Sequence, residues 1–177
     1  MNSLNIDINL ENIIPDKTRY DQEVTDSLNN IADLVPNHNS KVFIRRLWGY
    51  FKLEIWKQQG CKCAFCEKSI GSDDASIEHF RPKSETRDED NNLKTREAYW
   101  WLVYDHRNYI VSCSTCNNQK GNRFPIEDEG TRVTARNIVE ITDLNDDGVL
   151  EDEIPYIINP RYQTLNHIWI IAIHQIH

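Results

Sequence analysis

Apolar residues recur at helical spacing twice before residue 60. The first stripe predicts a helix over residues 20–34, and the second predicts one over 40–58 with Asn39-Ser40 as its start signal. The basic residues of the second segment lie off its stripe, which favours a helix that packs on a core over one that binds a partner. The positions that form the stripes are Val24, Leu28, Ile31, Leu34 and Val35 in the first segment, and Phe43, Leu47, Tyr50 or Phe51, and Ile55 in the second.

Past residue 60 the apolar segments are shorter. Ile77 and Phe80 flank a polar pair over residues 76–80, which predicts a strand, and Arg81-Pro82 ends it because proline cannot donate to a ladder. The pattern further predicts a charged loop over 83–97, a helix over 98–105 with Tyr99-Trp100-Trp101 as core bulk, a strand over 108–112, a short helix over 116–123 that ends near Phe124-Pro125, and two strands at 138–141 and 156–158.

These elements predict an α+β protein in three parts. Residues 1–39 are polar, so we expect an N-terminal arm that holds one helix. Residues 40–136 form the main domain, in which a packing helix precedes a strand, a connection, a second strand and a helix, together a ββα unit. Residues 137–177 form a strand-rich acidic tail. We expect similar chains to continue past Ile158-Asn-Pro160, so this chain is either truncated or naturally short.

Charge is unevenly distributed along the chain. The 177 residues carry a net charge of −8, which opposes tight binding to nucleic acid because phosphate contacts dominate that affinity. Residues 61–136 are close to neutral, with 12 Lys and Arg against 13 Asp and Glu, whereas the tail from 137 has seven acids and one Arg. We therefore expect contact with nucleic acid through a local basic strip, with further affinity from a partner.

The sequence contains no apolar run of the about 20 residues needed to span a bilayer. Its first ten residues lack the basic and apolar regions of a secretory signal. We therefore expect a cytoplasmic protein with no membrane partner. In that compartment, paired cysteines are metal ligands or redox groups rather than structural disulfides.

Four of the five cysteines form two Cys-x-x-Cys pairs, Cys63 with Cys66 and Cys113 with Cys116. Two thiolates at this spacing converge on one tetrahedral ion, and a site closed by four cysteines is structural. A redox dithiol is the alternative, but it normally needs only one such pair, on a βαβ frame that the pattern does not show. The sequence therefore predicts a structural zinc ion. Cys61 could replace Cys63 as a ligand, although the two-residue spacer favours Cys63.

Glu78 and His79 lie between the two pairs, and Asn117 directly follows the last cysteine. Hydrolysis of a phosphodiester requires an activated water and a leaving group whose charge is neutralised. Histidine, with an ordinary pKa of about 6.5, can accept a proton from water at neutral pH. The oxygens of Glu78 and Asn117 suit Mg²⁺ or Mn²⁺, which can hold the phosphate. Because neighbouring strand residues point to opposite faces, a bulge or a strand end must re-aim one member of the Glu78-His79 pair.

Five short motifs stand between residues 63 and 125. They are Cys63-Ala-Phe-Cys66-Glu67, Glu78-His79-Phe80-Arg81-Pro82-Lys83, Tyr99-Trp100-Trp101-Leu102, Asn108 through Asn117, and Lys120-Gly121-Asn122-Arg123-Phe124-Pro125. Together they resemble an HNH (His-Me finger) endonuclease domain. The resemblance is to a bacterial subfamily that includes the HNH nuclease subunits of Septu-type and retron-linked anti-phage systems.

The resemblance implies a role for each matching residue. His79 would be the general base, Asn108 would orient it, and Glu78 with Asn117 would ligate the catalytic Mg²⁺ or Mn²⁺. Asn117 stands where the family usually has His, which is acceptable because Mg²⁺ prefers oxygen to imidazole. His106 stands where the subfamily often has Trp, and a packing or surface role is favoured over a catalytic one. The resemblance also implies a zinc-stapled ββα core, double-stranded DNA as the substrate and an ATPase as the partner.

Four basic residues near these motifs are candidates for phosphate contacts. For each of them the alternative is solvated surface charge. They are Arg81, Lys83, Lys120 and Arg123.

Two further features carry no metal prediction. The segment Asp143 to Gly148 resembles the start of a calcium loop, but an EF-hand needs Glu at the twelfth position, where this chain has Ile154. A hairpin turn is the better interpretation. The C-terminal His167, His174 and His177 have no acid or cysteine nearby and are given no role.

The sequence as a whole predicts a metal-dependent endonuclease that acts as the effector of an anti-phage complex. The main alternative is a non-catalytic zinc module of the same fold that binds nucleic acid or protein. Such a module would not need the acid, the histidine and the asparagine together. Metal content and a plasmid-cleavage assay separate the two.

Overall fold

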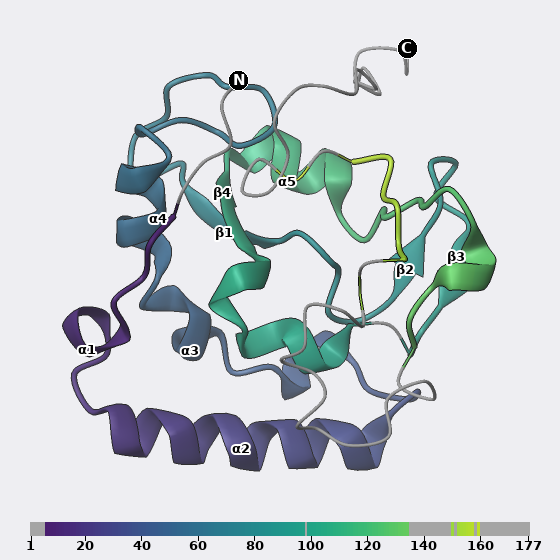
Figure 1. Ribbon diagram of the computed structural model, residues 1–177, viewed down its shortest axis with the longest axis horizontal. Coiled ribbons are helices and arrows are strands. Elements are labelled where there is room, and N and C mark those ends of the chain that lie inside the picture. The colour runs from purple at the N-terminus through teal and green to yellow at the C-terminus, as the bar shows by residue number, and fades with distance from the viewer. Residues whose placement is uncertain (1–5, 98, 135–149, 151, 158, 160–177) are drawn as a thin grey trace.

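The fold combines one long helix and several short ones with two small antiparallel sheets (Figure 1). The structure is a computed structural model that describes residues 6–97, 99–134, 150, 152–157 and 159. Its elements are α1 (Leu10–Ile13), α2 (Lys17–Leu34), the 3₁₀ helix η1 (Ser40–Val42), α3 (Arg45–Gly49), α4 (Lys52–Gln58), β1 (Ser76–His79), β2 (Thr86–Arg87), β3 (Leu93–Thr95), the 3₁₀ helices η2 (Trp100–Tyr104) and η3 (His106–Asn108), β4 (Tyr109–Ser112), α5 (Ser114–Lys120) and the 3₁₀ helix η4 (Glu129–Thr131).

Helix α2 forms one side of the molecule (Figure 1). The Asp16 carboxylate accepts the backbone N–H of Arg19 at 3.0 Å and caps the helix. The helix therefore begins at Lys17, three residues before the start at residue 20 that the apolar stripe predicts. Its buried residues are Tyr20, Ser27 and Ile31, and the Ser27 and Tyr104 hydroxyls lie 2.7 Å apart. These α2 residues belong to the stretch expected as an N-terminal arm, and in the structure they are part of the core.

The structure breaks the predicted helix over 40–58 into η1, α3 and α4. The break falls at Ile44, whose extended backbone directs its N–H to the Tyr104 hydroxyl at 2.9 Å. A single continuous helix is therefore wrong. Its apolar stripe is confirmed, because Leu47 and Ile55 are both fully buried.

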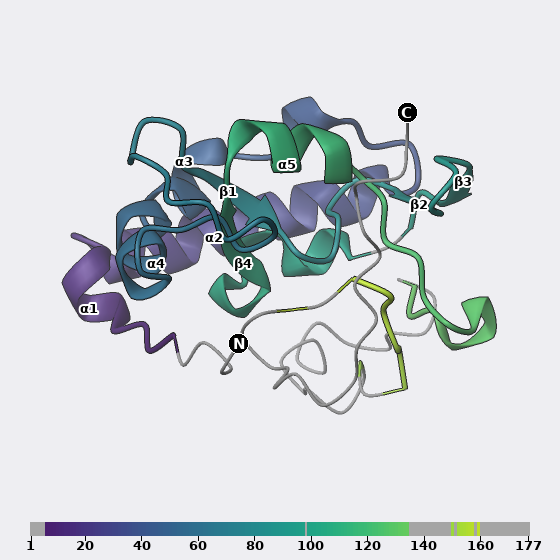
Figure 2. The ribbon, with the colours of Figure 1, turned by 90° about the horizontal axis from the view of Figure 1, so that it is seen from above.

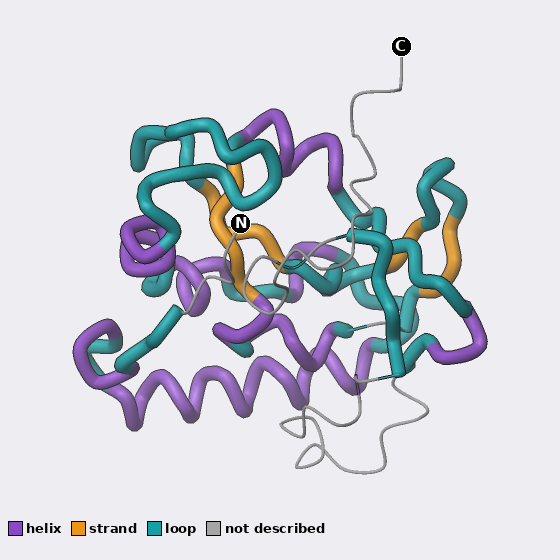
Figure 3. Tube along the Cα trace, turned by 45° about the horizontal axis from the view of Figure 1, so that its top comes forward, coloured by secondary structure: helices purple, strands orange, loops and turns teal. Residues whose placement is uncertain are grey.

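Strands β1 and β4 lie at the centre of the molecule (Figure 3). They pair antiparallel, with His79 opposite Tyr109. All four residues of β4 are buried. The Gln59 side chain, just after α4, bonds both backbone groups of Val111: it accepts from the N–H at 2.8 Å and donates to the carbonyl at 2.9 Å. Helix α4 is thereby attached to the sheet edge much as another strand would be.

The stretch predicted as a charged loop contains the second sheet, formed by β2 and β3. A turn joins the strands, with the Asp88 N–H donating to the Asn92 carbonyl at 3.0 Å and Asn91 in the left-handed region at φ 69°. Asparagine tolerates that conformation. Figure 2 shows this hairpin at the opposite end of the molecule from α1 and α4. The absence of any apolar alternation explains why the sequence did not predict these short strands.

The helix predicted over 98–105 is the 3₁₀ helix η2 rather than an α-helix. Tyr99, before it, lies in the left-handed region at φ 54°, and Asp105, after it, is extended, so the helix is limited to five residues. All five residues of η2 are buried. The expected core role of Trp100 and Trp101 is confirmed.

Part of the predicted C-terminal tail lies outside the described residues. Where the tail is described, Pro155 pairs with Ile126 in an antiparallel bridge and the Tyr156 N–H donates to the Pro125 carbonyl at 3.0 Å. In the described part of the chain, no helix is long and apolar enough to cross a membrane. The predictions that fall outside it are the strand at 138–141, the turn at 143–148, residue 158 of the second tail strand, and the statements on His167, His174 and His177.

Truncation of Ile31 tests whether α2 belongs to the core. Ile31 is 0% exposed, so Ile31→Ala should lower the free energy of unfolding by about 2–5 kcal/mol through lost burial and a residual cavity. The control Leu34→Ala lies on the same helix at a side chain that is 40% exposed, and it should cost about 1 kcal/mol or less. Urea denaturation followed by tryptophan fluorescence measures both. Equal losses would show that α2 does not pack as described.

Candidate functional site

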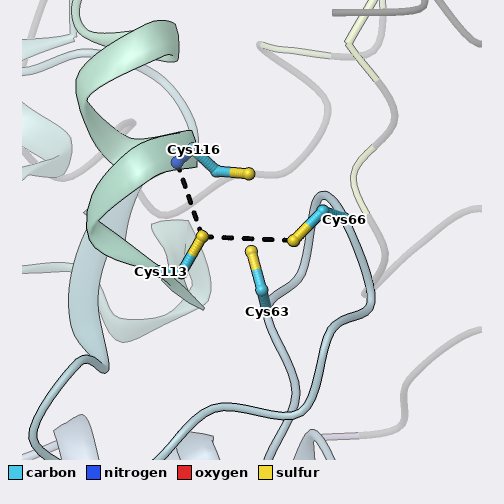
Figure 4. A group of neighbouring side chains, drawn as sticks. All are labelled: Cys63, Cys66, Cys113 and Cys116. Atoms are coloured by element: carbon cyan, nitrogen blue, oxygen red, sulfur yellow. Dashed lines mark hydrogen bonds between the residues drawn. The ribbon is translucent and has the colours of Figure 1, made fainter. Parts of the chain in front are cut away.

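Four cysteine side chains converge beside the end of β4 (Figure 4). The sulfur atoms of Cys63, Cys66, Cys113 and Cys116 all lie within 4.8 Å of one another, with 4.0 Å between those of Cys66 and Cys113. In a tetrahedral site with Zn–S bonds of about 2.3 Å, neighbouring sulfurs are about 3.8 Å apart. The cluster could therefore hold a metal ion such as zinc. Cys61 is half-buried and is not a member of the group.

The first cysteine pair lies in a tight turn that follows α4. The Cys63 N–H donates to the Lys68 carbonyl, and the Glu67 N–H donates back to the Cys63 carbonyl, both at 3.0 Å. Glu67 closes the turn in the left-handed region at φ 58°. The Ala64 N–H donates to the Val111 carbonyl at 2.9 Å, so the turn is attached directly to β4.

The second pair lies at the start of α5. Cys113 caps the helix, and its sulfur accepts the Cys116 backbone N–H at 3.5 Å. The helix begins two residues before the predicted range 116–123, and it ends at Gly121, whose φ of 49° terminates it. Burial, together with the bond to Cys113, raises the pKa of the Cys116 thiol. Metal binding requires thiolates, so it would release protons from this cluster.

His79 is the last residue of β1, and its ring is buried. Nε2 lies 2.9 Å from the Val103 carbonyl, which can only accept, so Nε2 carries the proton and Nδ1 presents a lone pair. Nδ1 lies 3.4 Å from Lys83 Nζ. Trp48 and Tyr109 pack edge-to-face against the ring, with centroids 5.0 and 5.2 Å away. Burial and then the Lys83 charge lower the pKa of His79 well below its ordinary value, so the imidazole is neutral at neutral pH.

Glu78 points toward α5 instead. Its Oε1 accepts from Lys120 Nζ at 2.6 Å, and the same ammonium donates to the His79 carbonyl at 3.0 Å and to the Gly121 carbonyl at 3.4 Å. The Lys120 side chain is only 1% exposed, so its charge is compensated inside the protein by the Glu78 carboxylate. The side chains of Glu78 and His79 therefore have different neighbours, and His79 does stand at a strand end.

One face of α5 and its cap carries Cys113, Cys116, Asn117 and Lys120. Positions three and four residues apart share a helix face, and Lys120 reaches Glu78, so this face points toward β1. Asn117 is half-buried on it. Within the described part of the chain, no side chain or backbone group hydrogen-bonds the carboxamide of its side chain. The helix thus presents thiols and a free amide oxygen on one side.

Asn108 immediately precedes β4 and holds the chain that follows His79. Its Oδ1 accepts the Arg81 N–H at 2.8 Å, and its Nδ2 donates to the Arg81 carbonyl at 3.0 Å. Its backbone carbonyl accepts the Phe80 N–H at 2.9 Å. Asn108 is buried, so these bonds are shielded from water and fix the two residues after His79.

Arg81 is engaged in the interior. Its Nε donates to Glu153 at 3.0 Å, and the Glu153 side chain is 0% exposed. That carboxylate also accepts the Tyr99 hydroxyl at 2.6 Å and the Val133 N–H at 2.7 Å. The Arg81 guanidinium lies 5.6 Å from the Phe124 ring centroid. Arg81 therefore ties β1 to the described part of the tail.

Lys83 has a different environment. Its ammonium lies 5.3 Å from the Trp48 ring centroid, and no described carboxylate forms an ion pair with it. Burial lowers the pKa of Lys83; Glu78 opposes this shift, and the charges of Lys120 and Arg45 add to it. The charges of Glu78 and Lys120 thus act on the ammonium that touches His79 Nδ1.

Two further residues that the sequence analysis singled out, Arg123 and His106, contact neighbouring parts of the chain. Arg123 is half-buried, and its Nη1 donates to the Gln119 carbonyl at 2.6 Å. The His106 ring stacks on Phe51 with centroids 5.8 Å apart and 9° between the planes. This contact agrees with the packing role favoured for His106.

Three residues that position the site were not predicted from the sequence. Trp48 contacts the His79 ring, Gln59 holds β4, and Glu153 binds Arg81. The only signal for Trp48 was a large aromatic residue between basic residues of the predicted packing helix. Gln59 and Glu153 resemble ordinary surface residues, and only the folded chain brings them to their partners.

The cysteine cluster gives a direct test. Purified protein should contain one zinc ion per chain by mass spectrometry, and Cys116→Ser should lose the ion and melt at lower temperature because structural zinc supplies folding free energy. Cys61→Ser is the matched control and should keep the ion. Full zinc content in Cys116→Ser, or its loss in Cys61→Ser, would contradict the four-cysteine assignment.

No family model matches the chain. Over 76 residues it is 41% identical to the Septu protein PtuB of Bacillus mycoides (strain KBAB4), a match that covers 42% of this chain and 26% of that protein. Over 79 residues it is 32% identical to the Septu protein PtuB of Bacillus thuringiensis, with the same shares. The chain therefore spans about a quarter of the length of the curated relatives it matches.

Among solved structures, the Type II-C Cas9 enzyme from Actinomyces naeslundii aligns with 60% of this chain and 9% of its own, at 21% identity. The TM-score is 0.31, which is too low to support an argument. The similarity to the two Septu PtuB proteins thus extends over less than half of this chain.

Proposed function

We propose that the chain is a metal-dependent endonuclease of the HNH type that hydrolyses phosphodiester bonds in double-stranded DNA. One observation carries the proposal: His79, whose Nε2 proton is held by the Val103 carbonyl, follows directly on Glu78, which is bonded through Lys120 to the α5 face that holds Asn117. In this proposal β1, β4 and α5 are the ββα core. The motif resemblance over 63–125 and the similarity to Septu PtuB proteins support it.

His79 is the general base in this proposal. The Val103 carbonyl holds the Nε2 proton and so selects the tautomer in which Nδ1 is basic. Nδ1 takes a proton from water, the resulting hydroxide attacks phosphorus, and the bond from phosphorus to the leaving oxygen breaks. The Val103 carbonyl then stabilises the imidazolium.

Glu78 and Asn117 would hold Mg²⁺ or Mn²⁺. Their donors are a carboxylate and a carboxamide oxygen, the type that these hard ions prefer. A bound ion would neutralise charge on the reacting phosphate and the leaving oxygen. Lys120 binds Glu78 Oε1 and leaves Oε2 for the ion. We therefore assign Lys120 to orienting Glu78, in place of the phosphate contact expected from the sequence.

Asn108 is a positioning residue. It bonds both backbone groups of Arg81 and one of Phe80, so it fixes the direction in which the chain leaves His79. The orienting role that the motif resemblance implies for Asn108 has this physical basis.

Lys83 and Arg123 are the proposed phosphate contacts, since Arg81 and Lys120 are paired with buried carboxylates. Two cations are few for a chain of net charge −8, so further affinity must come from elsewhere. We propose an ATPase partner subunit in a cytoplasmic anti-phage complex, because this is the arrangement in the subfamily that the motifs resemble.

Replacement of the base gives the principal test. His79→Ala should reduce nicking of supercoiled plasmid in Mg²⁺ or Mn²⁺ by about 10²–10⁴-fold, because a positioned general base contributes a factor of this size. His106→Ala is the matched histidine control and should cleave like the wild type. A zinc-loaded wild type that binds duplex DNA but never cleaves it would favour the non-catalytic module instead.

Asn117 and its neighbour separate metal binding from folding. Asn117→Ala should raise the Mg²⁺ concentration for half-maximal cleavage by about 10–100-fold or more, since loss of even an outer-shell partner costs a metal site a factor of this size and here an oxygen ligand is lost. Asn118→Ala removes the same amide from an exposed position of the same helix and should leave that concentration unchanged. Identical Mg²⁺ titrations for the two variants would exclude Asn117 as a ligand.

A further inference from the structure

We propose that Lys83 acts as a guard of the general base, by which we mean that its ammonium hydrogen-bonds His79 Nδ1 in the free protein and blocks it. A bound phosphodiester attracts the ammonium to a phosphate oxygen, so that Nδ1 can receive a proton from water. This inference rests on the proposed nuclease function and describes how substrate would activate the site. Lys83 would then be a catalytic residue, because it contacts the reacting phosphate.

The first support is the use of the two ring nitrogens of His79. Nε2 donates to the Val103 carbonyl at 2.9 Å, so Nδ1 is the only basic atom of the ring. Lys83 Nζ lies 3.4 Å from Nδ1 and can only donate. A water molecule cannot donate to the same lone pair while the ammonium does. The base is therefore blocked in the structure described.

The second support is the lack of a counter-charge for Lys83. Two aromatic rings lie beneath its ammonium, Trp48 with its centroid at 5.3 Å and Phe43 with its centroid at 6.0 Å. Rings attract a cation without neutralising it. Arg81 and Lys120 each have a buried carboxylate partner, whereas no ion pair of the described residues includes Lys83.

The charges around Lys83 favour an incoming anion. The nearby carboxylate, Glu78, is already bonded to Lys120, and Arg45 contributes a further positive charge. A phosphate oxygen carries charge and is a stronger acceptor for an ammonium than a neutral imidazole. The flexible four-carbon stem of lysine allows Nζ to move to such an oxygen. There it would also stabilise the charge that develops on the phosphate.

The local backbone explains why the Lys83 side chain points to the His79 ring. Pro82 follows the end of β1, and Asn108 clamps both backbone groups of Arg81, so the chain turns at a fixed place. The side chain four residues after His79 is thereby directed back to its ring.

Nuclear magnetic resonance of ¹⁵N-histidine-labelled protein tests the guard without any cleavage. The His79 signals are assigned by their loss in His79→Gln. In the free protein, Lys83→Met should shift the Nδ1 signal relative to the wild type, whereas the exposed control Lys57→Met should not. Addition of a short DNA duplex without divalent metal should move the wild-type Nδ1 signal toward that of Lys83→Met.

Two results would overturn the guard. One is the same Nδ1 signal in free wild type and free Lys83→Met. The other is a wild-type Nδ1 signal that stays unchanged at duplex concentrations that saturate binding by fluorescence anisotropy. If Lys83→Met does not fold, the duplex titration of the wild type decides alone.

Kinetics then separates the guard from the nuclease itself. Lys83→Met should slow single-turnover cleavage at saturating DNA by about 10²-fold, with Lys57→Met unaffected. A wild type that never cleaves would defeat the proposed nuclease, while the duplex-dependent Nδ1 shift would still report the guard. A Lys83→Met rate equal to that of the wild type would defeat the guard alone.

Discussion

The antiparallel pairing of β1 with β4 determines the distances between the side chains of the candidate site. Strand β1 ends in Glu78 and His79; β4 is immediately preceded by Asn108 and immediately followed by Cys113. A slip of one residue in this register would turn each β1 side chain to the other face. Glu78 would then lose α5, and the His79 ring would lose the Val103 carbonyl. The Gln59 amide and the cysteine turn, both bonded to Val111, hold the register from the opposite edge.

Two buried ion pairs also hold the elements of the candidate site together. Glu78 with Lys120 joins β1 to α5, and Arg81 with Glu153 joins the end of β1 to the tail. Removing one partner of such a pair leaves an uncompensated buried charge, which costs about 3–5 kcal/mol. The positions of β1, α5 and the tail around His79 therefore depend on both ion pairs being intact. Among the described residues, Lys83 forms no such ion pair, whereas Arg81 and Lys120 do.

The sequence anticipated the local elements of this arrangement better than its contacts. Both cysteine pairs and the two central strands follow from residue spacing, which acts over a few neighbours. The break at Ile44 was not visible, because the Tyr104 hydroxyl that bonds its N–H lies 60 residues away. The β2–β3 hairpin was missed for a related reason: its charged residues show no apolar alternation, and the buried position of Thr86 depends on packing with other segments.

The chemistry available to this protein was determined by sequence alone: four thiols at metal-binding spacing, an acid beside a histidine, and an asparagine after the last thiol. These are properties of residue type and short-range order. Which charges remain available was decided only by the tertiary structure. The sequence does not distinguish the four basic candidates, Arg81, Lys83, Lys120 and Arg123. In the structure, Arg81 and Lys120 form ion pairs with buried carboxylates, and the Lys83 ammonium lies 3.4 Å from His79 Nδ1. An ionised side chain is neutralised by whatever the fold brings within a few ångströms, and those partners come from as far away as 72 residues along the chain.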